Sequence, residues 1–83
     1  MQAQLSEHLT QRIFKIISNQ IEITPEEITL DSHFVADLGF DSLEIVEFVM
    51  AVEDEFHITV SDHDTEKIKT VQDAVHILQK TIL

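Results

Sequence analysis

The 83-residue sequence contains no cysteine, a single glycine and a single proline. Without cysteine, neither a disulfide nor a thiolate zinc site can stabilise the fold. With so little glycine and proline, tight turns are rare and long periodic segments must dominate, which favours helices. No apolar run approaches the roughly 20 residues of a membrane-spanning helix, and the first residues lack the features of a secretory signal. The sequence therefore predicts one soluble domain spanning residues 1–83.

Basic residues are also scarce, and their positions matter as much as their number. Five Lys and Arg stand against sixteen Asp and Glu, which gives a formal net charge of −11. No Lys or Arg lies between Lys15 and Lys67, whereas fourteen acids lie between Glu22 and Glu66. Such a segment repels nucleic acid and anionic lipid surfaces, so we expect basic proteins as partners. The alternative, that the charge only keeps a small protein soluble, stays open at this point.

The apolar pattern predicts helices separated by one long loop. A first helix is expected from about Leu5 to Gln20, with Leu5, Leu9, Ile13, Ile16 and Ile17 on its core face. The helical pattern fails from Ile21 to Asp41, apart from a short turn at 24–27 that begins with Thr and Pro. We expect this loop to pack over the core through its apolar residues, which are Ile28, Leu30, Phe34, Val35 and Leu38.

Three further helices are expected after the loop. They run from Asp41 or Ser42 to Phe56, from Asp62 to Ile68, and from Thr70 through Ile82. The last one begins with Thr70 and Asp73 in the arrangement of a capping box. The predicted fold class is all-α, with three main helices and one short helix packed as a bundle around a long first loop.

The helix that begins near Ser42 carries two apolar arcs. At 100° per residue, the arc at roughly 240° to 340° from Ser42 is the core face. Its members are Ile45, Phe48, Val49, Val52 and Phe56. A second arc, at roughly 40° to 100°, holds Leu43, Val46 and Met50 among acidic residues. One helix of a small bundle rarely buries both arcs, so we expect an exposed docking strip. Alternatively, Leu43 and Val46 complete the core under the long loop.

Ser42 lies at the start of this helix, where a serine is most often only a cap. However, Asp41 already supplies a capping side chain, and Gly39 supplies a flexible joint. The helix dipole also favours a phosphate on the Ser42 hydroxyl. The segment 39–43 does not have the pattern of a hydrolase nucleophile elbow.

The histidines and the acidic segment 62–64 give no sign of a specific site. We expect His33, His57 and His63 to be solvated at the surface. The residues Asp62, His63 and Asp64 lack the spacing of a calcium loop. No metal site is therefore expected, although the acidic stretch should bind cations loosely and gain stability from them.

The segment 37–47, which reads Asp-Leu-Gly-Phe-Asp-Ser-Leu-Glu-Ile-Val-Glu, resembles the attachment signature of the acyl carrier protein family. Segments 48–56 and 66–74 are also similar to the type II fatty-acid-synthesis carriers of bacteria and organelles. The resemblance covers essentially the whole chain. It implies a four-helix carrier bundle that is not itself an enzyme.

The resemblance also implies a cofactor, a cargo and partners. Ser42, flanked by Asp41 and Gly39, would bear 4′-phosphopantetheine, attached from coenzyme A by a phosphopantetheinyl transferase. The thiol of this arm would carry growing acyl chains as thioesters for fatty acid biosynthesis. Synthesis enzymes with basic docking patches would bind Asp41, Leu43, Glu44, Val46, Glu47, Met50, Glu53 and Asp54. We expect a monomer in the bacterial cytoplasm, or in an organelle matrix after removal of a transit segment.

Two other functions stay open at this point. The chain could be a pure interaction module that binds a partner complex structurally, or a carrier for polyketide, lipopeptide or cell-wall acyl transfer. Phe40 stands where many bacterial carriers of this family have Ala. We expect Phe40 to pack as an additional core residue; the alternative is that it alters the loop or the mouth of a cavity.

Overall fold

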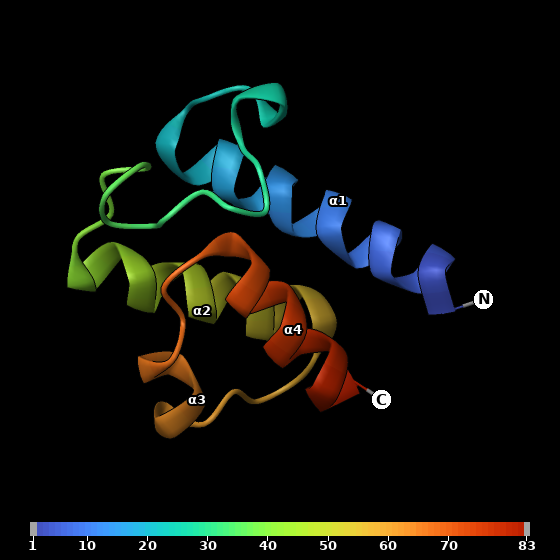
Figure 1. The fold of residues 1–83 in the computed structure, drawn as a ribbon. Helices are drawn as coiled ribbons and strands as arrows, with labels where there is room; N and C mark the ends of the chain where they lie inside the picture. Colours follow the sequence, from blue (N-terminus) through green and yellow to red (C-terminus); the bar gives the residue numbers. More distant parts are fainter. Residues whose placement is uncertain (1, 83) are drawn as a thin grey trace.

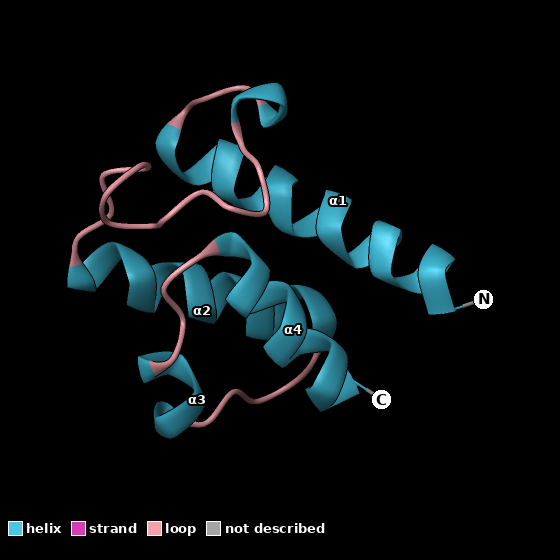
Figure 2. Cartoon of the chain, viewed as in Figure 1, coloured by secondary structure: helices cyan, strands magenta, loops and turns pink. Residues whose placement is uncertain are grey.

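A computed structural model of the protein describes residues 2–82, with side chains from residue 8 onward. It contains α1 (Gln2–Ile21), the 3-10 turn η1 (Pro25–Glu27), α2 (Ser42–Phe56), α3 (Asp62–Glu66) and α4 (Val71–Ile82) (Figure 1). Over residues 2–82 no strand is present (Figure 2), so the all-α prediction is confirmed. None of the helices described is long and apolar enough to cross a membrane.

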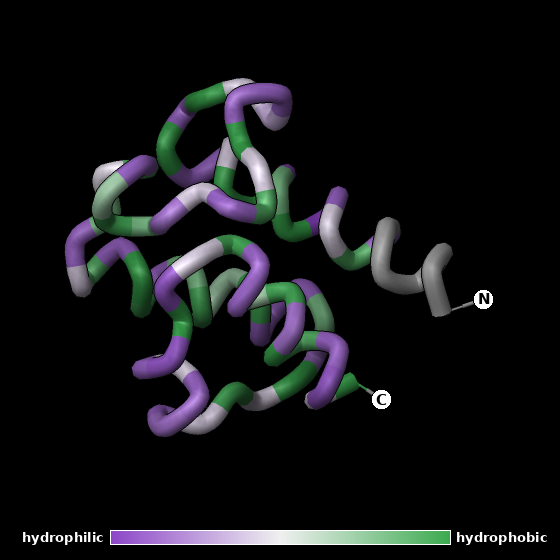
Figure 3. The backbone as a smooth tube through the Cα atoms, viewed as in Figure 1, coloured by the Kyte–Doolittle hydropathy of each residue, from purple (hydrophilic) through white to green (hydrophobic). Residues whose placement is uncertain are grey.

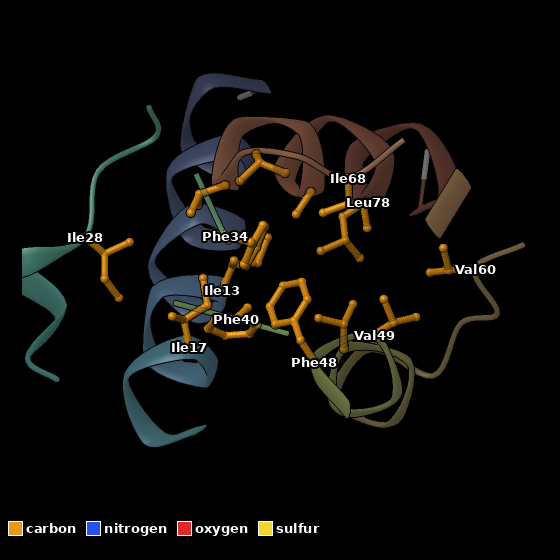
Figure 4. Close-up of a cluster of buried hydrophobic side chains, with 14 residues drawn as sticks. Ile13, Ile17, Ile28, Phe34, Phe40, Phe48, Val49, Val60, Ile68 and Leu78 are labelled. Atoms are coloured by element: carbon orange, nitrogen blue, oxygen red, sulfur yellow. The ribbon is translucent and has the colours of Figure 1, made fainter. Parts of the chain in front are cut away.

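The core lies where α1, α2 and α4 meet, and the long loop closes it (Figure 4). Its members from the helices are Ile13, Ile17, Phe48, Val49, Val52, Val71, Ala74, Val75 and Leu78. Leu9, Ile13 and Ile17 of the predicted α1 stripe are buried and Ile16 is half-buried, while the side chain of Leu5 lies outside the described residues. Burying one large aliphatic or aromatic side chain stabilises the fold by about 1.5–3 kcal/mol, so the helices depend mainly on these mutual contacts.

The long loop packs over the core, as predicted, but with fewer of its apolar residues than expected. Ile28 and Phe34 are buried and Leu38 is partly buried. Leu30 and Val35 are 40% and 54% exposed, so the prediction that they pin the loop is wrong. Successive side chains of a turn point to different sides, and Phe34 takes the inward position beside Val35. Figure 3 shows that polar and apolar residues are interspersed along this segment.

Backbone hydrogen bonds tie the long loop to the start of α4. The Phe34 amide donates to the Lys69 carbonyl, and the Val71 amide donates to the Ser32 carbonyl, each at 3.0 Å. An isolated antiparallel bridge joins His33 to Thr70 between them. The segment before α2 is thus held by α4, which follows it by some thirty residues in the sequence.

Three helix ends differ from the predicted ones. The first helix was expected from about Leu5 to Gln20, and α1 extends beyond both ends. The third helix was expected to reach Ile68, but α3 ends at Glu66. Lys67 closes this last turn, since its amide donates to the Asp64 carbonyl, and Ile68 turns inward to become 6% exposed. The helix therefore ends two residues before Ile68, which packs in the core.

Candidate functional site

The first turn of α2 is capped by Asp41 and Glu44. The Glu44 amide donates to Asp41 Oδ1 at 2.8 Å, and the Asp41 amide donates to Glu44 Oε1 at 3.1 Å. These reciprocal bonds form a capping box. Ser42 is the first helical residue, it is exposed, and its hydroxyl makes no hydrogen bond within the described part of the chain. The alternative that Ser42 serves only as the cap is therefore wrong.

The chain reaches Ser42 through a backbone held on both sides of Gly39. Gly39 has a φ of 73°, a left-handed conformation that costs a residue with a side chain about 1–2 kcal/mol. A Cβ at Gly39 would meet no atom within 4 Å, so the backbone conformation alone favours glycine here. The Gly39 amide donates to the Val35 carbonyl and the Phe40 amide to the Phe34 carbonyl. Both bonds fix the direction in which the chain enters α2.

Phe40 is 2% exposed and belongs to the core, which confirms that it packs as an additional core residue. Its ring meets the Phe34 ring edge-on, with 5.2 Å between the centroids. The Phe34 ring lies 5.0 Å from that of Phe48, which comes from α2. Figure 4 shows the three rings gathered in the centre of the core. The aromatic cluster thus holds the segment before Ser42 against the helix that follows it.

The first turn of α2 gives Ser42 an electrostatic setting suited to a phosphodiester. Amide groups at a helix start are not used by the helix itself, and the helix dipole places partial positive charge there. A phosphodiester on the Ser42 oxygen would lie at this end of α2, in solvent and clear of the core. An exposed hydroxyl with no capping role therefore fits a phosphopantetheine attachment.

The second apolar arc of α2 is exposed. Leu43, Val46 and Met50 are 67%, 48% and 61% exposed, whereas Phe48, Val49 and Val52 on the first arc are buried. Ile45 and Phe56 of the first arc are partly buried against the same core. We call Leu43, Val46 and Met50 the apolar strip. The alternative that Leu43 and Val46 complete the core is wrong.

The acidic residues predicted beside the apolar strip divide into two groups. Glu47 and Asp54 are exposed, and no hydrogen bond or ion pair is found for their side chains in the described residues. Glu53 is half-buried, and its Oε2 accepts a hydrogen bond of 2.8 Å from the Val60 amide. Asp41 and Glu44 are used in the capping box. Glu47 and Asp54 are therefore the carboxylates most available to a partner.

Among the described residues, no histidine is hydrogen-bonded to the Ser42 hydroxyl. His57 ends α2 with a φ of 55°, and His63 lies exposed in α3. His33 differs from the expected solvated state, because it is half-buried and its Nδ1 accepts hydrogen bonds from two backbone amides. Among the described side chains, no group of three or more His, Asp or Glu is arranged to hold a metal ion.

Two contacts between α1 and α2 had no signal in the sequence. Gln20 Nε2 donates to the Glu44 carbonyl at 2.7 Å near the start of α2. Near the end of α2, Arg12 pairs with Glu55, and its guanidinium carbon lies 4.3 Å from the centroid of the Phe56 ring. The hydrogen bond and the positive charge of Arg12 lower the pKa of Glu55. Such contacts depend on the distance between helices, which a hydrophobic pattern does not contain.

Comparison with known proteins identifies the family. Residues 11–78 match the family described as a phosphopantetheine attachment site. An acyl carrier protein of Cyanidium caldarium is 47% identical over 72 residues, covering 87% of this chain and 84% of the relative. Acyl carrier proteins of two strains of Buchnera aphidicola subsp. Acyrthosiphon pisum, Tuc7 and APS, are each 47% identical over 73 residues, covering 88% of this chain and 91% of the relative.

Proposed function

Because this chain belongs to the acyl carrier proteins, the carriers with a phosphopantetheine attachment site, we propose that Ser42 is the residue that bears the arm. The cofactor is 4′-phosphopantetheine, and the chain is a carrier and not an enzyme. One observation supports Ser42 above all. Its hydroxyl is exposed and unbonded at the first residue of α2, while Asp41 and Glu44 do the capping.

Attachment requires a phosphoryl transfer to Ser42 Oγ. The oxygen forms a bond to the β-phosphorus of coenzyme A, and the pyrophosphate bond to the nucleotide breaks. The nucleotide leaves as adenosine 3′,5′-bisphosphate, and the hydroxyl proton passes to a base of the phosphopantetheinyl transferase. The carrier contributes an exposed nucleophile at a fixed place and the positive end of α2, which stabilises the phosphodiester formed.

The attached arm supplies a terminal thiol, which this cysteine-free chain lacks. That thiol carries growing acyl chains as thioesters, and the pathway we propose is fatty acid biosynthesis. Each methylene group removed from water contributes about 0.8 kcal/mol. A medium-length chain that lies against the bundle therefore gains several kcal/mol by the same principle, and a partner enzyme must offer an equal apolar site to accept it.

Partner enzymes are proposed to dock on the apolar strip and the acids around it. Leu43, Val46 and Met50 offer exposed apolar area, and Met can adapt to several partners. Glu47 and Asp54 supply exposed negative charge beside the strip, and Asp41, Glu44 and Glu53 add charge while keeping their structural bonds. Basic patches on the enzymes would be steered to this face, giving fast and weak docking. We further propose a monomer located in the bacterial cytoplasm or an organelle matrix.

Intact-mass spectrometry tests the attachment site. Wild-type chain incubated with coenzyme A and a competent transferase should gain the mass of one phosphopantetheine, and Ser42→Ala should gain nothing. Ser61→Ala is the matched control, because Ser61 is another exposed serine at a helix start. A wild-type chain that stays unmodified would overturn the carrier function. Modification that persists in Ser42→Ala would overturn the choice of Ser42.

A further inference from the structure

The turn that leads to Ser42 is held at its start by an imidazole. The amides of Val35 and Ala36 both donate to His33 Nδ1, at 3.2 and 3.1 Å. An imidazole nitrogen accepts hydrogen bonds only when it carries no proton. The geometry therefore requires neutral His33 with its proton on Nε2. Protonation at Nδ1 would turn this acceptor into a donor that faces two other donors.

His33 closes the same turn through its backbone. Its amide donates to Asp37 Oδ2 at 2.7 Å, and its carbonyl accepts from the amides of Asp37 and Leu38. The next bond runs from the Gly39 amide to the Val35 carbonyl, and Ser42 follows three residues later. Val35 therefore takes part both in the bond to the imidazole and in the bond that orients Gly39. The conformation of segment 33–39 depends on the imidazole at its start. The end of this segment leads directly into the residues that carry Ser42.

Charged groups near His33 come from two parts of the chain. Asp37 lies in the same turn. Asp73 lies on α4; burial raises the pKa of Asp73, hydrogen bonds from Thr70 and Lys69 lower it, and a positive charge on His33 would lower it further. Lys69 contacts this turn through its backbone carbonyl, which accepts a hydrogen bond from the Phe34 amide. A protonated imidazole would be attracted to the two carboxylates and would no longer accept from Val35 and Ala36.

We propose that neutral His33 is a positioning residue for the Ser42 attachment segment. Its Nδ1 holds the turn at 33–38 in the shape that presents Ser42 to the transferase, and a proton on Nδ1 would release the Val35 and Ala36 amides. This role rests on the proposed function, because it concerns the presentation of Ser42 for modification. The turn should therefore be more ordered while Nδ1 is free to accept these two bonds than when Nδ1 carries a proton.

The first measurement follows the Val35 and Ala36 amides of the unmodified chain by NMR from about pH 5 to 8, the range in which histidine usually titrates. In the wild type, both amide resonances should shift in step with the His33 imidazole, and the protection of both amides, measured relative to the intrinsic exchange rate at each pH, should fall in acid. His33→Asn offers a side-chain oxygen that accepts without titrating, so protection should persist and its pH dependence should vanish. His33→Ala offers no acceptor and should lose protection at every pH.

The second measurement is the rate of Ser42 modification across the same pH range. His63→Asn is the control, because it removes an exposed histidine from α3 and should behave as the wild type. Relative to this control, His33→Ala should be modified several-fold more slowly at neutral pH, and His33→Asn should recover most of the rate. In mild acid His33→Asn should outpace the wild type, since only the wild type then loses its acceptor.

Either of two results would overturn the proposal. One is that the Val35 and Ala36 resonances do not follow the His33 titration. The other is that folded His33→Ala is modified as fast as the wild type at every pH. The amide measurement needs no arm, so it separates this inference from the proposed function. If no variant is modified, including the wild type, the attachment at Ser42 fails while the amide titration still decides whether His33 holds the turn.

Discussion

Gln20, near the end of α1, donates a hydrogen bond from Nε2 to the Glu44 carbonyl oxygen of α2 across 2.7 Å. The other side-chain atom of this amide, Oε1, is buried without a hydrogen-bond partner among the described residues. One bond between helices is thus formed at the cost of one unpaired acceptor. It lies two residues beyond Ser42, so it fixes α1 to the end of α2 that carries the proposed attachment.

Replacing Gln20 tests this contact. Gln20→Glu removes the donor and places a carboxylate beside the Glu44 carbonyl, so the free energy of unfolding should fall by about 1–3 kcal/mol. Gln20→Leu removes donor and unpaired acceptor together and should stay within about 1 kcal/mol of the wild type. Urea unfolding measures both. Asn19→Asp, with the same charge change at an exposed neighbour, is the control, and equal stability of Gln20→Glu and Asn19→Asp would contradict the contact.

Asp73 makes part of the stability depend on pH. Burial raises the pKa of Asp73, but hydrogen bonds from the Thr70 and Lys69 amides outweigh it, so the pKa is lowered on balance. A carboxyl group whose pKa is lower in the folded state stabilises the fold above its unfolded pKa. That contribution is lost as the pH falls through the folded pKa.

Asp73→Asn should therefore be less stable than the wild type at neutral pH and approach it in acid. Urea unfolding from about pH 7 down to pH 3 measures the difference, which should shrink steadily below the pKa of an ordinary aspartate. Asp62→Asn, at an exposed acid in α3, serves as control. A difference between wild type and Asp73→Asn that stays constant with pH would show that the cap is not ionic.

The burial of Phe40 predicts a large effect of truncation beside the attachment site. Phe40→Ala should lower the free energy of unfolding by about 3–5 kcal/mol, because it removes a ring that packs edge-on against Phe34. Leu43→Ala, three residues later and 67% exposed, should change it by no more than about 0.5 kcal/mol. Thermal or urea unfolding compares the two. Similar losses in both variants would contradict the assignment of core and strip.

Charge reversal tests the docking face. Glu47→Lys should slow modification by the transferase several-fold at low salt, because an exposed carboxylate beside the strip becomes a cation facing a basic partner. The rates of Glu47→Lys and the wild type should converge as added salt screens the charges. Glu26→Lys, an exposed acid of η1, is the control for net charge. Equal rates for Glu47→Lys and Glu26→Lys at low salt would remove Glu47 from the docking face.

The net charge of −11 predicts that salt stabilises the fold. Fourteen acids between Glu22 and Glu66 repel one another, and screening weakens that repulsion. The melting temperature should rise with added NaCl, and with MgCl₂ at matched ionic strength by a similar amount, since no metal-holding group occurs among the described side chains. Differential scanning fluorimetry measures both series. A melting temperature that does not move would show that the acids are already well separated.

Much of the fold could be predicted because helical periodicity records burial directly. The two arcs of α2 follow from residue spacing alone, and so does the capping box at Thr70 and Asp73, where each side chain accepts from the other's backbone amide. At Ser42, spacing located the helix start, and the neighbouring Asp41 indicated which residue caps it. These features depend on residues near one another in the chain.

The parts that could not be predicted depend on residues far apart or on backbone bends. Leu30 and Val35 are apolar, yet the turns of the loop expose them. Gln20 and Arg12 contact α2 from α1, and no periodicity encodes which polar side chains meet across helices. The hydrogen bonds of His33 were not predicted for the same reason. They depend on a turn in which two backbone amides point at one imidazole nitrogen.

The buried rings of Phe40 and Phe48 stand on either side of Ser42 in the sequence, only two and six residues away. Once an arm is attached, its base is therefore a fixed pivot, and the distance that the thiol can travel is set by the bonds of the arm alone. The thioester can then reach only points within one arm's length of the start of α2. An enzyme that loads or extends the acyl chain must therefore bring its reaction centre within that distance.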